Sequence, residues 1–303
     1  MKALTLRAEE DPTKMSPHDL LSYTEHNLVL FDKFPKSYYH FLIIPRIQPP
    51  HLTASRLRNL RELFKGDKQT AKEVIDRLKT DADALCKDIE GEMVRRRKFK
   101  WDIWVGFHAV QSMDHVHLHV ISADLLAPGM KHKKHYNSFH PRRGFFIHLD
   151  DILDWFEAVP NVWRRNIELN RAFFEPLLKE PLECFYCYEE MKNMPKLKEH
   201  IREHWEALRE EGKSRAEQKK MQEAKLAARK KKMEAKQKEE SADGSKQERD
   251  VEDEKRNETK TAENVAEEDT GDKRPSAEPA PEVKPPQKKQ RTRLQDPDED
   301  WEF

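Results

Sequence analysis

The chain has 303 residues, of which 57 are basic and 57 acidic, so its formal net charge is zero and no overall field marks a polyanion as its partner. Charged side chains make up 38% of the sequence and hydrophobic ones 36%, which is low for a chain that folds along its whole length. The presence of only three cysteines argues against a disulfide framework and for a reducing compartment. Since no apolar run has the length of a signal peptide or a membrane span, we expect a soluble intracellular protein.

The chain divides by composition near residue 206. All 14 histidines lie at or before His204, and no aromatic residue occurs between Trp205 and Trp301. A segment that long without aromatic side chains buries too little apolar surface to offset its ordering entropy. We therefore expect a flexible N-terminus at 1–15, a folded domain at 16–149, a smaller module at 150–206 and a largely disordered charged tail at 207–303, with a solvated helix at 206–240.

The first predicted elements in chain order are strands separated by turns. Residues 16–30 begin like a short helix, with Pro17 at its first position, and continue as a strand. The run from Phe31 to Lys36 has the composition of a turn. The aromatic and β-branched run 38–44 then predicts a strand that stops at Pro45.

A long helical stretch follows. Apolar residues recur at helical spacing from Thr53 to about Glu92, which predicts one or two helices interrupted near Gly66-Asp67. Further strands are predicted at 101–107 and 115–122, and a helical pattern at 150–180. This order suits an α+β domain with an antiparallel sheet and flanking helices.

Histidines alternate with aliphatic residues in the strand predicted at 115–122. Because successive side chains on a strand point to opposite faces, the histidines would share one face and the aliphatic residues would pack on the core. The two sets are His115, His117 and His119, and Val116, Leu118 and Val120.

Three interpretations fit such a row of imidazoles. The rings could bind zinc, or they could be satisfied by backbone carbonyls without further role. The third is catalytic, because neutral imidazole is a nucleophile and its unperturbed pKa of about 6.5 lets a neighbouring ring act as acid or base. One ring would attack phosphorus and form a covalent nucleotidyl-histidine, while its neighbours stabilise the charged oxygens.

The run from His115 to Ile121 resembles the signature of the histidine-triad superfamily, and the run from Phe31 to Pro45 resembles the nucleotide-binding strand of that superfamily. The resemblance implies that the middle histidine, His117, is the nucleophile. It also implies that His119 contacts the phosphate and the leaving group, and that His115 supports the site.

The same resemblance assigns contacts to the nucleotide. Asp32 would accept hydrogen bonds from the ribose hydroxyls, and His40 would be the supporting histidine of the preceding strand. Ser112 would contact the phosphate, and Met113 and His108 lie in the same matching stretch, 106–114. Taken alone, Asp32 would be a turn aspartate that caps backbone amides and His40 a satisfied core residue, so both assignments depend on the motif.

A second motif has the spacing C-x2-C-x12-H-x3-H, with Cys184, Cys187, His200 and His204 at the ligand positions. Two thiolates on a turn and two imidazoles one helical turn apart can close a tetrahedron around one structural zinc ion. A single C2H2 finger buries little surface, so it serves either DNA contact beside the catalytic domain or structural support. The pairing of the two domains favours DNA contact.

A histidine-triad domain followed directly by this finger is similar to the aprataxin branch of the superfamily, over residues 16–206. The basic segment 131–139 resembles the stretch with which that branch holds nucleic acid phosphates, a contact that positions DNA without reading its sequence. The DNA contacts that the resemblance implies are Lys131, Lys133, Lys134, His135 and Ser138. Without the motif this segment would be a solvated charged loop.

The resemblance departs from the branch at both ends. Only about fifteen residues precede the catalytic domain, so we expect no N-terminal phosphopeptide-binding domain. The charged tail is an addition whose protein partners the sequence does not identify. The expected architecture is the shorter, fungal-type form.

The resemblance implies a DNA 5′-adenylate hydrolase of single-strand break repair. Such an enzyme removes AMP from nicked or 5′-adenylated DNA ends through a covalent AMP–histidine intermediate. The resemblance also implies that it removes guanylate caps from 3′ DNA ends, with GMP as the product. The rival hypotheses are a small-molecule histidine-triad hydrolase of dinucleoside polyphosphates or phosphoramidates, and a non-enzymatic zinc-dependent nucleic-acid-binding protein. The finger and the basic segment argue against the first, and the complete triad argues against the second.

The tail carries a basic cluster at 284–293 of the nuclear-localisation type, which predicts a nuclear protein. A random basic patch in a charged tail is the alternative. The acidic run from Asp296 to Glu302 could pair with basic segments or dock a partner, and no membrane partner is expected.

Overall fold

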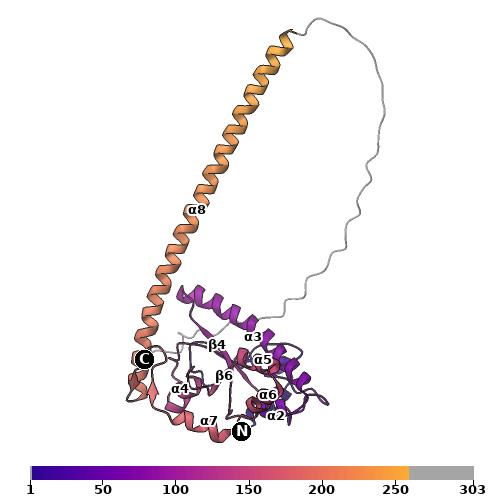
Figure 1. Cartoon of the computed structure of the whole chain (residues 1–303), viewed down its shortest axis with the longest axis vertical. Coiled ribbons are helices and arrows are strands. Elements are labelled where there is room, and N and C mark those ends of the chain that lie inside the picture. The colour runs from indigo at the N-terminus through magenta and orange to yellow at the C-terminus, as the bar shows by residue number, and fades with distance from the viewer. Residues whose placement is uncertain (1, 259–303) are drawn as a thin grey trace, which may run out of the picture. The chain divides into compact units, whose positions relative to one another are not determined.

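The computed structural model describes the backbone of residues 2–258 and the side chains of residues 2–234 (Figure 1). The described chain separates into two units, the first ending at Ser214 and the second beginning at Arg215. The basic cluster predicted at 284–293 and the acidic run from Asp296 to Glu302 lie outside the described residues.

Six strands form a sheet in the order β1-β2-β3-β5-β4-β6, and every neighbouring pair is antiparallel. Their bounds are Leu20–Tyr23 (β1), Asn27–Phe31 (β2), His40–Pro45 (β3), Ile103–His108 (β4), Leu118–Ser122 (β5) and Phe146–His148 (β6). β3 and β5 are neighbours although a long helical stretch separates them in the chain. The predicted α+β class with an antiparallel sheet is confirmed.

Two helices, α2 (Leu60–Lys65) and α3 (Lys68–Arg97), form the long helical stretch between β3 and β4. The side chains of Asn59 and Asp67 accept hydrogen bonds from the first turn of each helix, so both helices begin at a cap. The chain is interrupted near Gly66-Asp67, as predicted. Buried residues of α3, such as Ile75, share one core cluster with Leu118 of the sheet, so α3 supports the strand that carries the histidine motif.

The N-terminal prediction is wrong. Residues expected to be flexible form α1 (Ala3–Glu9) and a short 3-10 helix, η1 (Pro12–Lys14). Leu4 and Ala8 are buried in a cluster with apolar residues of β1, β2 and β3. The short helix expected after Ser16 is a turn, and β1 follows it. Seven helical residues show too little periodicity to reveal a buried face, and only the sheet gives that face a surface to pack on.

The elements after β5 lead from the sheet to the finger. They are α4 (Lys133–Phe139), β6, α5 (Leu149–Glu157), α6 (Pro160–Ile167), α7 (Arg171–Phe174), the 3-10 helix η2 (Glu175–Lys179), and the hairpin of β7 (Leu182–Glu183) and β8 (Glu190–Met191). The basic segment expected as a loop is therefore the helix α4. Its buried Tyr136 and Phe139 supply the packing that a solvated loop would lack.

The last described element is α8 (Met194–Glu258), which Figure 1 draws as one long helix. It contains the helix expected at 206–240 and continues to Glu258, where disorder was expected from residue 241. Ala, Glu, Lys and Arg are strong helix formers, which favours the extension. Within the part of the chain that the structure describes, no helix combines the length and the apolar character needed to cross a membrane.

Candidate active site and zinc centre

The strand register brings three histidines together. β3 pairs His40 with Ile121 and Leu42 with His119, so His40 and His119 are diagonal neighbours. On the other side of β5, Gly106 of β4 faces His119, and His108 follows two residues later on the same face. The ring centroid of His119 lies 5.3 Å from that of His40 and 4.5 Å from that of His108.

A chain of hydrogen bonds fixes the tautomers of His40 and His119. The Lys36 amide donates to Nδ1 of His40 at 3.2 Å, so the proton of this ring lies on Nε2. That Nε2 lies 3.0 Å from Nδ1 of His119 and donates to it. His119 therefore carries its own proton on Nε2, an atom that is buried without a hydrogen-bond partner among the described residues. A bound phosphate oxygen would satisfy this donor.

His117 presents the opposite nitrogen. Its Nδ1 lies 2.7 Å from the backbone carbonyl of His115 and donates to it, which leaves the lone pair on Nε2. Burial lowers the pKa of His117, although the bond to His115 and the Asp32 carboxylate oppose the shift. The neutral tautomer with an unprotonated Nε2 is the form that a nucleophilic histidine needs. Its ring lies 5.0 Å from that of His119.

His115 does not stand beside the other two histidines of the motif, which corrects the prediction of three rings on one strand face. Its φ of 104° lies in the left-handed region, and β5 begins only at Leu118, so strand alternation cannot extend back to it. Its Nε2 donates to the carbonyl of Pro45 at 2.7 Å inside the core. His115 therefore orients His117 through its carbonyl, while its ring anchors the segment to β3.

Gln111 holds the same segment, and sequence analysis did not single it out. Its side-chain NH2 lies 2.9 Å from the carbonyl of Met113, 2.8 Å from that of His115 and 3.0 Å from that of Arg58. The amide thus braces the backbone from which His117 projects. Its place within the matching stretch 106–114 was the signal that could have revealed it.

Opposite charges flank the histidines. Oδ1 of Asp32 accepts the Phe34 amide at 2.6 Å, as an ordinary turn aspartate does, while its Oδ2 lies 3.7 Å from Nε2 of His40. Lys36 is half-buried, and burial lowers its pKa while Asp32 opposes the shift. The Lys36 charge also contributes to lowering the pKa values of His40 and His119. Sequence analysis missed Lys36 because a lysine in a polar turn looks solvated.

The remaining predicted nucleotide contacts occupy different environments. His108 has a buried Nε2 without a partner among the described residues, and burial lowers its pKa well below the usual value. Phe139 of α4 packs against it at 4.6 Å and stands edge-on to His119 at 5.3 Å. Ser112 is exposed and Met113 is partly buried. Their nucleotide contacts stay predictions.

The residues predicted to contact DNA lie on α4 and just before it, and they differ in exposure. Lys131 and Lys134 are exposed and Lys133 is half-buried, so all three ammonium groups can reach a ligand. Burial, followed by the Lys36 charge, lowers the pKa of His135 to about 4. Ser138 is buried and its hydroxyl donates to the carbonyl of His135 at 2.9 Å. Its contact with DNA stays a prediction.

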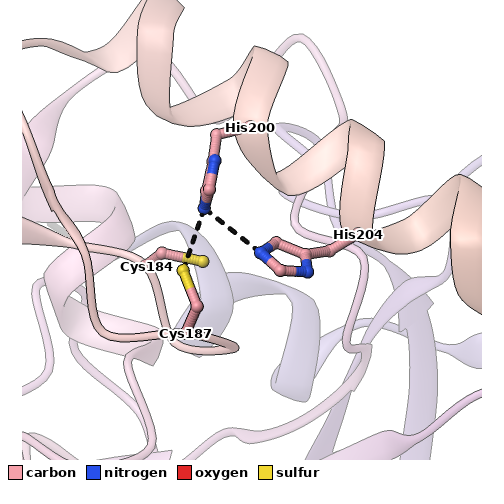
Figure 2. Close-up of side chains that lie close together, drawn as sticks. All are labelled: Cys184, Cys187, His200 and His204. Carbon is pink, nitrogen blue, oxygen red and sulfur yellow. Dashed lines mark hydrogen bonds between the residues drawn. The ribbon is translucent and has the colours of Figure 1, made fainter.

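The four predicted zinc ligands converge, as Figure 2 shows. Sγ of Cys187 lies 3.0 Å from Nε2 of His200, which lies 3.1 Å from Nε2 of His204. Cys184 follows β7, and its carbonyl accepts the Tyr188 amide at 2.7 Å, which closes the knuckle that turns both thiols inward. The ligand helix is anchored by the buried Leu197 and Ile201, as well as by Trp205.

This donor set fits zinc. Two thiols and two imidazoles whose ligand atoms lie within 4.8 Å of one another match a tetrahedral ion with bonds of about 2.0 to 2.3 Å. One proton between the two Nε2 atoms would make a single hydrogen bond, whereas a zinc ion can accept a lone pair from all four donors at once. The residues therefore form a zinc-binding finger.

Hydrogen bonds join the finger to α4. The hydroxyl of Tyr136 donates to the carbonyl of Glu183 at 2.7 Å and accepts the Phe185 amide at 3.0 Å. The side chain of Asn137 donates to the carbonyl of Glu180 at 2.9 Å. The zinc knuckle and the helix that covers the histidines therefore form one packed assembly.

Two families match the chain. Residues 13–125 match the family described as the HIT domain, and residues 142–207 match the C2HE / C2H2 / C2HC zinc-binding finger. These matches confirm the histidine-triad fold and the finger that the sequence predicted.

Relatives with both parts are known. The aprataxin of Danio rerio is 34% identical over 177 residues, which cover 58% of this chain and 47% of that protein. The aprataxin-like protein of Saccharomyces cerevisiae is 30% identical over 202 residues, which cover 60% of this chain and 86% of that protein. The chain spans about half the length of the vertebrate relatives that it matches.

Two solved structures of the aprataxin ortholog Hnt3 resemble the fold. The complex with DNA superposes with a TM-score of 0.50 at 26% identity, covering 65% of this chain and 91% of Hnt3. The complex with DNA and guanosine gives a TM-score of 0.52 at 25% identity, covering 69% of this chain and 97% of Hnt3.

Proposed function

This chain belongs to the aprataxin family of histidine-triad nucleotide hydrolases, and from that premise we propose that it is a DNA 5′-adenylate hydrolase that removes AMP left on 5′ DNA ends by abortive ligation. One observation carries the proposal: His117 presents an unprotonated Nε2 beside His119, whose Nε2 proton has no partner among the described residues. A nucleophile and a hydrogen-bond donor are thus held side by side. Because Hnt3 has been solved with DNA and guanosine, we extend DNA and, for 3′ caps, guanylate to this chain as ligands.

In the first step Nε2 of His117 attacks the phosphorus of the adenylate. A P–N bond forms as the P–O bond to the DNA breaks, and the DNA leaves with its 5′-phosphate. His119 donates an Nε2 hydrogen bond to the leaving phosphate, which departs with its negative charge and needs no proton, while Lys36 adds positive charge beside it. The His115 carbonyl stabilises the charge that develops on His117, and Asp32 accepts the ribose hydroxyls.

In the second step a water molecule replaces the departed DNA. Its oxygen attacks phosphorus and its released proton passes to solvent, while the Nε2–H of His119 stays hydrogen-bonded to the phosphate. The P–N bond breaks, AMP leaves, and His117 returns to its neutral form with Nδ1 still bound to the His115 carbonyl. Both rings end in the tautomers in which they began.

The other predicted features serve this reaction from outside the histidine cluster. One zinc ion held by Cys184, Cys187, His200 and His204 would supply a structural cross-link that fixes the finger beside α4. Lys131, Lys133 and Lys134 would hold DNA phosphates. The basic cluster at 284–293 supports action in the nucleus.

Replacing His117 tests the proposal. His117→Ala should lower AMP release from a 5′-adenylated nick about 10⁴-fold or more, because nothing else supplies the attacking lone pair. DNA affinity should change less than about twofold, since the ring lies inside the protein and contacts no distant phosphate. His51→Ala, at an exposed histidine, is the matched control. Unimpaired AMP release by His117→Ala would refute the assignment.

The same assay separates the rival small-molecule activity. kcat/KM for the adenylated nick is compared with that for a diadenosine polyphosphate and for a nucleoside phosphoramidate. We expect the DNA substrate to be preferred. Equal turnover of the small substrates and loss of the DNA preference would identify a small-molecule hydrolase instead.

A further inference from the structure

The second unit begins as a basic helix. Between Arg215 and Glu234, α8 carries eight basic and three acidic side chains, an excess of five positive charges in a chain whose total charge is zero. The basic residues are Arg215, Lys219, Lys220, Lys225, Arg229, Lys230, Lys231 and Lys232. We call this segment, residues 215–234, the basic helix.

The basic helix offers its charges to a partner. Every side chain from 217 to 234 is exposed. Lys219 lies 3.9 Å from Glu223, yet three acidic side chains cannot neutralise eight basic ones. Since each residue advances about 100° around an α-helix, the cationic groups point in many directions and surround the helix with positive potential.

The apolar residues of the basic helix exclude two kinds of partner. Met221, Leu226 and Met233 are its large apolar side chains, and each is more than half exposed. Their spacing gives no stripe at intervals of three and four residues. A coiled-coil partner requires such a stripe, and so does an amphipathic helix lying on a membrane. With these two kinds of partner excluded, the charge of the basic helix favours a polyanion as its partner.

We propose that the basic helix is a second nucleic-acid-binding element, which binds the phosphate backbone of duplex DNA without sequence preference. The choice of DNA as the polyanion rests on the proposed function. Twenty helical residues extend about 30 Å, which corresponds to roughly nine base pairs of B-DNA. The basic helix is therefore long enough to contact several phosphates of one duplex.

Neutralising one block of the basic helix tests the proposal. The variant R229Q/K230Q/K231Q/K232Q removes four charges and keeps residues that favour helix, while K230R/K231R/K232R keeps every charge. Binding to a plain duplex of about 30 base pairs is measured by fluorescence anisotropy as a function of salt. The glutamine variant should lower the slope of log K against log salt by up to about 3.6 and weaken binding roughly tenfold at about 0.1 M salt. The arginine variant should bind like the unmodified chain.

Two further measurements keep this result separate from the proposed function. AMP release from a 5′-adenylated duplex of about 10 base pairs should be unchanged in the glutamine variant, because the block lies outside the histidine site. Circular dichroism should show the same helix content. If the unmodified chain released no AMP, the proposed function would be overturned. The measured binding to the plain duplex would still stand as an independent result.

The proposal is overturned if the glutamine variant keeps the salt slope and affinity of the unmodified chain. It is also overturned if the variant binds DNA normally but loses binding to phosphatidylserine vesicles, since the partner would then be an anionic membrane. A fall in DNA affinity shared equally by the arginine variant would point to altered helix packing and would also overturn it.

Discussion

The reactivity of each histidine in the site depends on which of its two nitrogens carries the proton. Two backbone groups determine this position. The Lys36 amide places the proton of His40 on Nε2, and the His115 carbonyl places the proton of His117 on Nδ1. The result is an unprotonated Nε2 on His117 and a protonated Nε2 on His119. The motif alone predicts neither proton position, because a histidine in a sequence does not show which backbone group its ring will contact.

Lys36 supports a prediction at this scale. Its half-buried charge lies close enough to the histidines to lower their pKa values, so it should stabilise the negative charge that develops on the phosphate. Lys36→Gln should lower kcat/KM for AMP release at least about tenfold. Lys33→Gln, at an exposed lysine of the same turn, should leave kcat/KM within about twofold. Equal effects of the two changes would contradict a direct role for Lys36.

At the scale of elements, the exposed and buried sides of α4 make different contacts. Its solvent side carries Lys133 and Lys134, and its buried side places Phe139 against His119. Tyr136 of the same helix bonds to two backbone groups of the finger knuckle. α4 therefore connects the zinc finger to the histidine cluster through packed contacts.

Removing one hydroxyl tests this connection. Tyr136→Phe leaves the buried Phe185 amide without an acceptor, so the free energy of unfolding should fall by about 1 to 2 kcal/mol in urea denaturation. Tyr39→Phe is the matched control, because the Tyr39 hydroxyl is buried without a hydrogen-bond partner among the described residues. Its removal should leave stability unchanged or raise it slightly. A Tyr136→Phe variant as stable as the unmodified chain would count against the connection.

At the scale of the whole molecule, stability depends on several imidazoles buried in the neutral form. Burial lowers the pKa values of His40, His115, His135 and His140 to about 4 in each case. In the unfolded chain the same groups titrate near about 6.5, so between these values the unfolded state binds more protons. Their stabilising contribution is therefore complete above about pH 6.5 and is lost as the pH falls toward 4.

One of these groups lies outside the histidine cluster and allows a clean test. This pKa shift of His140 corresponds to at most about 3.4 kcal/mol over the full window and about 2 kcal/mol between pH 7.5 and 5, so His140→Gln should lose less stability over that range than the unmodified chain. His51→Gln, at an exposed position, serves as the control. The free energy of unfolding of all three proteins is measured against pH with zinc present. Parallel curves for the three proteins would contradict a contribution from neutral His140.

Zinc removal acts at the same scale. Without the ion, the two-stranded hairpin and the ligand helix keep only their packing on α4 and on neighbours such as Trp101 and Trp104, which should not maintain the knuckle. A chelator should abolish hydrogen-exchange protection at residues 182–205 and lower the melting temperature by several degrees. Protection of the β5 amides should persist, because α3 and the sheet form their own core. Retention of full protection in the finger after zinc loss would contradict this expectation.

Much of the fold and of the candidate site could be predicted from the sequence alone. The strands, the interrupted helix, the antiparallel sheet and the four zinc ligands follow from periodicity, element order and ligand spacing, and the family follows from the resemblance of two motifs to the histidine-triad signature. The motif also identified His117, His119, His40 and Asp32 as one site.

Tertiary structure decided what depends on packing between distant segments. The positive φ of His115 separates its ring from the other two, and Lys36 acquires its role only when the turn before β3 folds onto the histidines. The N-terminal helix and α4 form because their buried side chains find surfaces supplied by other elements, strands β1 to β3 for the first and β5, β6 and the finger for the second. A sequence records which residues can be apolar or charged, but burial and proton position are properties of the assembled environment.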